Sequence, residues 1–212
     1  MLTVLFDNDG VLVDTERLYY QATRETLESA GVRFTLEQYI EHSMRQGRNT
    51  MELAAPHGIV GEAVEKLREK RNERYSELIR STRCLLDGVE ETLQKLHGRV
   101  AMGIVTGSRR DHFEIIHSAT GVLKYFDFQF TREDYVNAKP HSDPYLVALE
   151  KRALDPRRCV VIEDSPRGCT AAVAAGLRCL VIPTPMTKDC DFPGAHRILK
   201  SIAEVPREVI AG

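Results

Sequence analysis

Short apolar segments alternate with helical patterns along most of the chain, and this alternation limits the possible folds more than any other feature. The apolar segments occupy residues 2–6, 101–105, 126–130, 159–162 and 179–182. Each has the length of a strand and reads as a continuous apolar run, which is typical of parallel strands buried on both faces. Together with the helical patterns between them, they predict an α/β fold: a parallel sheet with helices on both faces.

Three helices between the later strands are predicted from their start signals and apolar spacing. Asp87 is positioned to cap one helix, and residues 109–119 carry the apolar spacing of a second. Ser142 or Asp143, followed by Pro144, opens a third, because proline suits the first turn of a helix. A sheet connected in this way places its functional site at the carboxyl ends of its strands.

The region from residue 16 to residue 80 interrupts this alternation, because it contains helical patterns and no convincing strand. Thr35 and Gln38 have the spacing of a capping box at a helix start. We therefore predict an all-helical domain at residues 16–80, inserted into a core made of residues 1–15 and 81–212. A helical stripe within the insert consists of Val64, Leu67, Tyr75 and Leu78.

The charge balance and the apolar content exclude several classes of protein. With 29 Lys and Arg against 31 Asp and Glu, the formal net charge is −2, whereas a nucleic-acid-binding surface needs a clustered basic excess. No apolar run approaches the roughly 20 residues of a membrane-spanning helix. The first residues, MLTVLFDNDG, lack the basic start of a secretory signal. We expect a cytoplasmic protein without nucleic-acid or membrane partners, and a monomer by default.

The five cysteines follow no metal-binding or disulfide pattern. They are odd in number, have no CxxC spacing, and lie mostly within apolar stretches such as the one that begins at Cys159. Cysteines of this kind behave as small buried hydrophobes. We expect them to be reduced.

Polar residues directly follow three of the predicted strands. In a parallel sheet these strand ends lie along one edge, so the side chains are expected to gather there. Two carboxylates about 5 Å apart repel each other by roughly 3 kcal/mol at an effective dielectric of 20, so such a cluster requires a positive charge. The strand-end segments are Asp7-Asn8-Asp9-Gly10, Thr106-Gly107-Ser108 and Glu163-Asp164-Ser165.

Two sources of positive charge fit this edge. Oxygen ligands without histidine or cysteine nearby favour Mg²⁺, which commonly binds beside a substrate phosphate. Lys139 lies in a loop before the next helix, at the same edge of the sheet. Its ammonium group can fix a nucleophile and neutralise a bound phosphate.

Each of these segments alone also has a simpler interpretation. Asp9-Gly10 is a common turn, Thr106 and Ser165 can cap the helices that follow them, and Lys139 can be a surface residue. The combination, in this order and with the polar segments directly after buried strands, favours a phosphate-handling site.

Four motifs, FDNDGVLVDTE, IVTGS, AKPHSDPY and VIEDSPRG, resemble those of the haloacid dehalogenase superfamily of aspartate-nucleophile phosphotransferases. Within it, the chain is similar to the branch of beta-phosphoglucomutase and phosphoglycolate phosphatase, which carries a helical cap after the first strand. The resemblance spans essentially the whole chain. It implies a Rossmann-like core and a cap domain that determines substrate specificity.

The resemblance also implies roles for individual residues. Asp7 would be the nucleophile and Asp9 the general acid and base. Thr106 would donate a hydrogen bond to the phosphoryl group, and Lys139 would stabilise its charge. A carboxylate beside a cation is a competent nucleophile toward phosphorus, and an aspartyl phosphate divides one difficult step into two.

By the same resemblance, Mg²⁺ is the cofactor. Asp7, the backbone carbonyl of Asp9, and Asp164 would hold the ion, and Glu163 would lie near it. The third motif departs from the usual KP-x-P-D pattern, which leaves the alignment of Asp143 open.

The resemblance favours a phosphatase for a small phosphorylated metabolite, such as a sugar phosphate or a phosphorylated sugar acid. A phosphomutase is the alternative, because Thr15 matches a hinge residue of the mutase, whose hinge histidine is replaced here by Tyr19. A non-catalytic metabolite binder is the third reading, but the nucleophile and metal ligands that it would lack are all present.

Candidate substrate-binding residues come from the second motif and from the insert. Gly107, Ser108 and Arg109 fall where the mutase holds its non-transferring phosphate. Arg45 and Arg48 lie in a stretch that resembles the family's substrate-facing loop, where an arginine can bind a carboxylate or a second phosphate. Both arginines can equally be solvated surface charges. Other candidates in the insert are Tyr19, His42 and Gln46.

Overall fold

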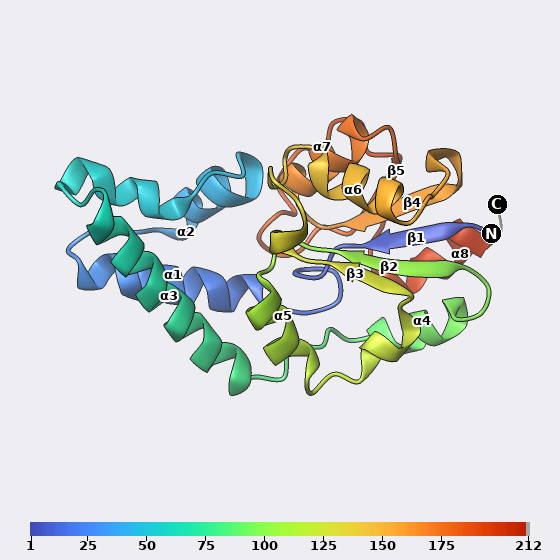
Figure 1. The fold of residues 1–212 in the computed structure, drawn as a ribbon, viewed down its shortest axis with the longest axis horizontal. Coiled ribbons are helices and arrows are strands. Elements are labelled where there is room, and N and C mark those ends of the chain that lie inside the picture. Colours follow the sequence, from blue (N-terminus) through green and yellow to red (C-terminus); the bar gives the residue numbers. More distant parts are fainter. Residues whose placement is uncertain (211–212) are drawn as a thin grey trace.

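A six-stranded parallel sheet forms the centre of the protein (Figure 1), whose computed structural model describes residues 1–210. The strand order is β3-β2-β1-β4-β5-β6. This arrangement confirms the predicted α/β class. The strands are β1 (Thr3–Phe6), β2 (Ala101–Val105), β3 (Phe128–Phe130), β4 (Cys159–Glu163), β5 (Arg178–Val181) and β6 (Arg197–Ile198).

The first strand lies between β2 and β4, which brings three strand ends together. Thr3 is opposite both Ala101 and Cys159, so the three strands run in register. Beyond β1, the N–H of Asp7 donates to the Ile162 carbonyl at 2.9 Å, which continues the pairing into the polar segment. The chain adds β2 and β3 on one side of β1, and then β4, β5 and β6 on the other side. The strand order therefore reverses between β1 and β4.

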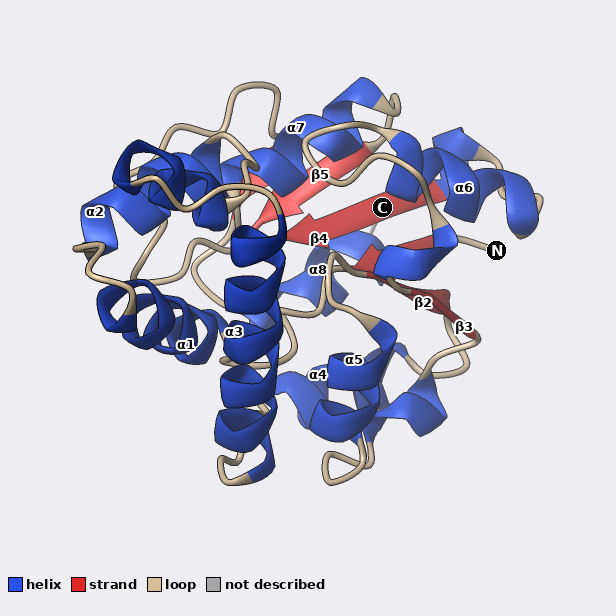
Figure 2. Ribbon diagram, turned by 60° about the vertical axis from the view of Figure 1, so that its left-hand side comes forward, coloured by secondary structure: helices blue, strands red, loops and turns tan. Residues whose placement is uncertain are grey.

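Helices cover both faces of the sheet, as Figures 1 and 2 show. Successive strand residues point to opposite faces, so Val4 and Phe6 contribute to one apolar core and Leu5 to the other. Full burial of side chains of this size stabilises the fold by roughly 1.5–3 kcal/mol each. The first core also contains residues of α4 (Val89–Leu96), α5 (Arg110–His117) and α8 (Val205–Ile210), and the second contains residues of α6 (Asp143–Lys151) and α7 (Pro166–Ala174).

Between β1 and α4 the chain forms a helical segment that lies beyond the carboxyl ends of the strands (Figure 1). It contains an apolar cluster of its own, in which aromatic and methionine side chains such as Phe34 and Met44 pack with aliphatic ones. The segment comprises α1 (Glu16–Ser29), α2 (Leu36–Tyr39), a π-helical turn (Ile40–Arg45), a 3₁₀ segment (Thr50–His57) and α3 (Glu62–Arg80).

Two local features fix this segment. The predicted capping box at the start of α2 is present: Thr35 Oγ1 accepts from the Gln38 N–H, and the Gln38 side chain accepts from the Thr35 N–H. Gly47 packs directly on the core, since a Cβ at this position would lie 2.5 Å from Pro140 Cδ and 2.7 Å from the Lys139 carbonyl oxygen. The loop after the π-helical turn therefore sits on the lysine that follows β3.

Three elements differ from the sequence-based expectation. The third strand begins at Phe128 rather than at residue 126, because a 3₁₀ turn at Val122–Tyr125 precedes it. The strand β6 was not predicted, and both of its residues are exposed. Asp87 caps no helix: the N-cap of α4 is Gly88, and no side chain bonds to the first turn.

The cysteines are free, and all but the partly exposed Cys190 are buried. Among residues 1–210, none of the helices combines the length and the apolar composition that a bilayer-spanning helix requires.

Candidate active site

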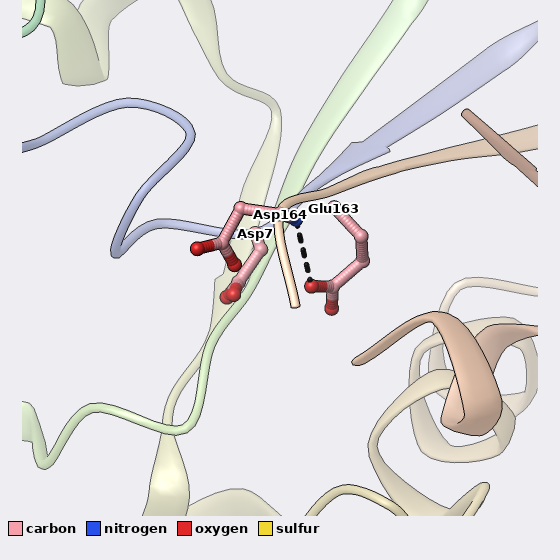
Figure 3. Close-up of side chains that lie close together, drawn as sticks. All are labelled: Asp7, Glu163 and Asp164. Atoms are coloured by element: carbon pink, nitrogen blue, oxygen red, sulfur yellow. Dashed lines mark hydrogen bonds between the residues drawn. The ribbon is translucent and has the colours of Figure 1, made fainter. Parts of the chain in front are cut away.

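Three buried carboxylates lie together at the end of the β1–β4 pair. Ligand oxygens of Asp7, Glu163 and Asp164 are all within 4.8 Å of one another. Figure 3 shows Asp7 and Asp164 directed to the same side, while Glu163 curls back toward the N–H of Asp164. The strand register creates this cluster, because Phe6 is opposite Ile162 and the next residues of both strands carry the carboxylates.

Lys139 supplies the positive charge among these acids. Its side chain is buried, and its Nζ lies 3.0 Å from Asp7 Oδ1 and 2.7 Å from Glu163 Oε1. The ammonium also donates to the Val105 carbonyl at 2.9 Å. Burial pushes the pKa of Lys139 down, but the charges of Asp7 and Glu163 outweigh burial and raise this pKa. Lys139 is therefore a fixed cation at neutral pH.

Glu163 is held as the partner of Lys139. Its Oε1 also accepts from the Tyr145 hydroxyl at 2.6 Å. Gly168 leaves room for this carboxylate, because a Cβ there would lie 2.0 Å from Glu163 Oε2. Tyr145 is a contact that the sequence analysis did not anticipate, although its place in the motif AKPHSDPY associates it with Lys139.

The Asp7 and Asp164 carboxylates fit a divalent cation. Burial, reinforced by the charge of Glu163, raises the pKa of Asp7 to about 7 and the pKa of Asp164 well above its ordinary value. Asp164 Oδ2 is buried without a hydrogen-bond partner in residues 1–210, and Asp7 Oδ1 has only its ion pair with Lys139. Buried, crowded carboxylate oxygens with free lone pairs form the kind of donor set that Mg²⁺ prefers.

Gly10 makes room for this carboxylate pair. Its φ is +82°, a conformation that favours glycine, and a Cβ here would lie 2.1 Å from Asp164 Oδ2. The glycine after Asp9 is thus required both by the turn and by the close approach of Asp164.

Asp9 is held by hydroxyl groups from two parts of the chain. Its carboxylate accepts hydrogen bonds from Ser108 Oγ at 2.6 Å, from Thr106 Oγ1 at 3.2 Å and from Thr15 Oγ1. Its side chain is not part of the three-carboxylate cluster, so in this arrangement a metal contact from Asp9 would come from its backbone. The hydroxyls keep the carboxylate in one orientation without a charged partner.

A cavity of about 620 Å³ lies between the sheet and the helical segment, and Asp7 is the member of the cluster that lines it. A second cavity, of about 490 Å³, lies near the end of α3 and contains none of the residues of the cluster. Of the residues predicted from the sequence, the larger cavity is lined by Asp7, Asp9, Lys139, Gly107, Ser108, Arg109, Arg48 and Tyr19.

The two arginines of the predicted substrate loop lie in different places. Arg45 does not line the cavity: its side chain is exposed, ion-pairs with Glu41 at 3.3 Å and approaches Cys190. Arg48 lines the cavity and pairs with Glu52 at 3.3 Å.

A partly buried ion pair that the sequence analysis missed joins the helical segment to the core. Arg167, near the start of α7, lies 3.1 Å from Glu16, the first residue of α1, and donates to Ser43 Oγ at 3.2 Å. Glu16 in turn accepts from the Tyr39 hydroxyl. Arg167 and Glu16 both lie inside recognised motifs, VIEDSPRG and FDNDGVLVDTE, which was the available signal.

Comparison with known proteins agrees with this geometry. The family model described as haloacid dehalogenase-like hydrolase matches residues 4–182. A probable pseudouridine-5'-phosphatase of Drosophila melanogaster is 30% identical over 211 residues, covering 96% of this chain and 91% of the relative. Hexitol phosphatase B of Escherichia coli (strain K12) is 29% identical over 217 residues, covering 100% of this chain and 97% of the relative.

A solved structure has the same fold over nearly the whole chain. CbbY from Rhodobacter sphaeroides, in complex with phosphate, superposes with a TM-score of 0.81 at 27% identity, covering 97% of this chain and 96% of that one. Two further relatives are the fructose-1-phosphate phosphatase YqaB of Escherichia coli (strain K12), 29% identical over 187 residues, and the phosphorylated carbohydrates phosphatase of Thermotoga maritima, 31% identical over 191 residues. The chain belongs to the haloacid dehalogenase-like hydrolase family.

Proposed function

We propose that this protein is a Mg²⁺-dependent phosphatase that hydrolyses a small phosphorylated metabolite, a sugar phosphate or a phosphorylated sugar acid, through an aspartyl phosphate on Asp7. The observation that carries this proposal is the position of Asp7, which lies at the base of the cavity, 3.0 Å from the Lys139 ammonium and beside Asp164. The names of the curated relatives, which include a hexitol phosphatase, support this class of substrate.

Asp7 is the nucleophile in this proposal. One of its oxygens forms a bond to phosphorus while the bond from phosphorus to the leaving oxygen breaks. Lys139 neutralises negative charge on the phosphoryl oxygens, as a cation placed before the reaction begins. A Mg²⁺ ion held by Asp7 and Asp164 would supply further positive charge to the phosphoryl group and favour the ionised form of Asp7.

Asp9 moves the proton in both steps. It protonates the leaving oxygen in the first step and then accepts a proton from the water that attacks the aspartyl phosphate, which releases inorganic phosphate and restores the Asp7 carboxylate. Proton transfer of this kind is commonly worth about 10² to 10⁴ in rate. The hydroxyls of Ser108, Thr106 and Thr15 orient the Asp9 carboxylate toward this task.

Residues 16–80 act as a cap domain on a core of residues 1–15 and 81–212. The cavity is lined from both sides, by Asp7 and Lys139 of the core and by Tyr39 and Asn49 of the cap. The cap excludes water from the first step and provides the contacts that select the substrate. The ion pair between Arg167 of the core and Glu16 of the cap helps to hold the cap domain against the core.

The proposal is tested by phosphate release from p-nitrophenyl phosphate and from a panel of sugar phosphates, with Mg²⁺. The wild-type protein is expected to turn over at least one of these compounds, and Asp7→Asn is expected to abolish turnover. Asp14→Asn is the matched control, because Asp14 is half exposed and, within residues 1–210, forms its ion pair with Arg17 alone. Turnover retained by Asp7→Asn would contradict the mechanism.

Phosphomutase activity is the second candidate. The observation in its favour is the hydrogen bond from Thr15, which matches a mutase hinge residue, to the proposed acid Asp9. Incubation with β-glucose 1-phosphate separates the two functions, since a mutase forms glucose 6-phosphate whereas a phosphatase forms glucose and inorganic phosphate.

A further inference from the structure

An arginine occupies a buried position on the face of α3 that packs inward. The buried residues of this helix are Leu67, Arg71, Tyr75 and Ile79, which recur every fourth position. Arg71 is only 6% exposed, yet it is charged where its neighbours in the row are apolar or aromatic. It also lines the cavity that contains Asp7.

The other cations that line this cavity are already partnered within the protein. Arg132 donates to the backbone carbonyls of Tyr135 and Val136. Each of the remaining cations has a carboxylate within ion-pair distance: Lys139 with Asp7 and Glu163, Arg167 with Glu16, Arg48 with Glu52, Arg68 with Glu65, and Arg109 with Asp111.

Arg71 differs from all of these. Within residues 1–210 it has neither a carboxylate nor a backbone carbonyl as a partner. Its Nε donates to the Asn72 side chain at 2.9 Å, and its guanidinium carbon lies 4.4 Å from the centroid of the Tyr19 ring. The neighbouring His112 offers no counter-charge either, because an imidazole is neutral or cationic and never negative.

A buried cation without a counter-charge is unfavourable, and it is stabilised when a ligand supplies the missing anion. The planar guanidinium group matches carboxylate and phosphate oxygens in a bidentate geometry, and the contact with Tyr19 restricts its orientation. The cavity, at about 620 Å³, is in the range of small-molecule sites and has room for more than a phosphoryl group.

We propose that Arg71 binds a second anionic group of the substrate. This inference rests on the proposed function: one phosphoryl group reacts at Asp7, and a carboxylate or a second phosphate of the same molecule pairs with Arg71. The preferred substrates are therefore phosphorylated sugar acids or sugar bisphosphates rather than sugar monophosphates, which carry no second anionic group. Because Asp7 belongs to the core and Arg71 to α3, such a substrate bridges the two parts of the protein.

The test compares probe pairs that differ in the second anion. 6-Phosphogluconate against glucose 6-phosphate reports on a carboxylate, and fructose 1,6-bisphosphate against fructose 6-phosphate reports on a phosphate. We expect a higher kcat/KM for the doubly anionic member of at least one pair. Arg71→Met should lower that value about 10- to 100-fold, the range for loss of a charged hydrogen bond. Turnover of p-nitrophenyl phosphate should change by less than about twofold.

Two further variants complete the experiment. Arg71→Lys keeps the positive charge but cannot bind two oxygens in a bidentate geometry, so it should retain part of the preference. This variant also provides the test if Arg71→Met does not fold. Arg74→Met is the matched control, because Arg74 lies on the same helix, pairs with Glu25 and Glu77, and does not line the cavity. It should leave the preference unchanged.

The possible failures are distinguishable. If Asp7-dependent turnover exists but the wild-type protein shows no preference for either doubly anionic probe, the inference is wrong and the proposed function stands. Equal losses on the probes with two anionic groups and on those with one would also overturn it, because they would indicate a structural role for Arg71. If no probe releases phosphate, the inference fails together with the proposed function.

Discussion

Lys139 and Glu163 form a buried ion pair at 2.7 Å, and this pair is built into the candidate active site rather than placed beside it. Glu163 is fully buried, and Lys139 also contacts Asp7. Glu163 thus holds the Lys139 ammonium in place next to Asp7. The same arrangement makes the catalytic centre dependent on the stability of the core.

Lys139→Met is expected to remove activity and to destabilise the protein. The substitution leaves Glu163 buried with only hydroxyl and amide donors, and breaking a buried ion pair in this way costs about 3–5 kcal/mol. Urea unfolding measures the loss, and phosphate release measures the activity. Adding Glu163→Gln to this variant should restore stability but not activity. Lys95→Met, at an exposed position of α4, is the control, and wild-type stability of Lys139→Met would contradict the prediction.

Asp164→Asn is expected to stabilise the metal-free protein and to abolish its response to Mg²⁺. Burial raises the pKa of Asp164 most, and the charges of Glu163 and Asp7 raise it further. The ionised carboxylate is therefore unfavourable in the metal-free protein, and an uncharged amide removes this cost. A bound ion stabilises the wild type by mass action, about 2.7 kcal/mol at a concentration of 100 Kd. Urea unfolding with a chelator and with Mg²⁺ tests both statements. Asp87→Asn, an exposed substitution, should keep the full Mg²⁺ response, and an undiminished response of Asp164→Asn would exclude this residue as a ligand.

The central strands could be predicted because each is a continuous apolar run that ends in polar residues. This pattern holds for β1, β2 and β4, which are buried on both faces. It fails at β6, which consists of only two residues, both exposed. A strand this short and this little buried carries no apolar signal, whereas β3, at the opposite edge of the sheet, keeps Phe128 and Phe130 buried and was predicted.

The strand-end acids could be predicted for the same reason, since a parallel sheet dictates where they meet. The contacts of the helical segment could not, because they depend on how that segment packs over the sheet. Arg167 and Glu16 are 151 positions apart, and the sequence around either residue does not indicate that the other is its partner. For Arg71 the sequence does contain one indication: a charged residue stands in the row of α3 that faces inward.

Gly10→Ala is expected to damage the site while Gly31→Ala does not. Both glycines have φ near +80°, so each substitution introduces similar backbone strain, of about 1 kcal/mol. Only at Gly10 would the new Cβ meet another group, Asp164 Oδ2 at 2.1 Å; at Gly31 nothing lies within 4 Å. Mg²⁺-dependent phosphate release and thermal unfolding of the two variants measure the difference. Equal activity in both would show that Asp164 can move away without consequence.

His117→Gln is expected to remove a pH dependence of stability. Burial lowers the pKa of His117 to about 4 from 6.5, and its Nε2 lies 2.7 Å from Asn8 Oδ1, in the loop between Asp7 and Asp9. Between these two pKa values the unfolded chain binds the proton and the folded protein does not. Folding stability therefore falls as the pH drops from about 6.5 to about 4, by up to roughly 3 kcal/mol for this group.

Urea unfolding between pH 4 and pH 7.5 measures this dependence. The variant keeps a side-chain amide that can donate to Asn8, so its stability should fall less steeply than that of the wild type over the acid range. His97→Gln is the control, because His97 is exposed at the end of α4. Parallel curves for the wild type and His117→Gln would mean that the buried imidazole is charged in the folded protein. In that case Nε2 would still donate to Asn8 Oδ1, and Nδ1, which lies 2.9 Å from Thr120 Oγ1, would become a donor as well.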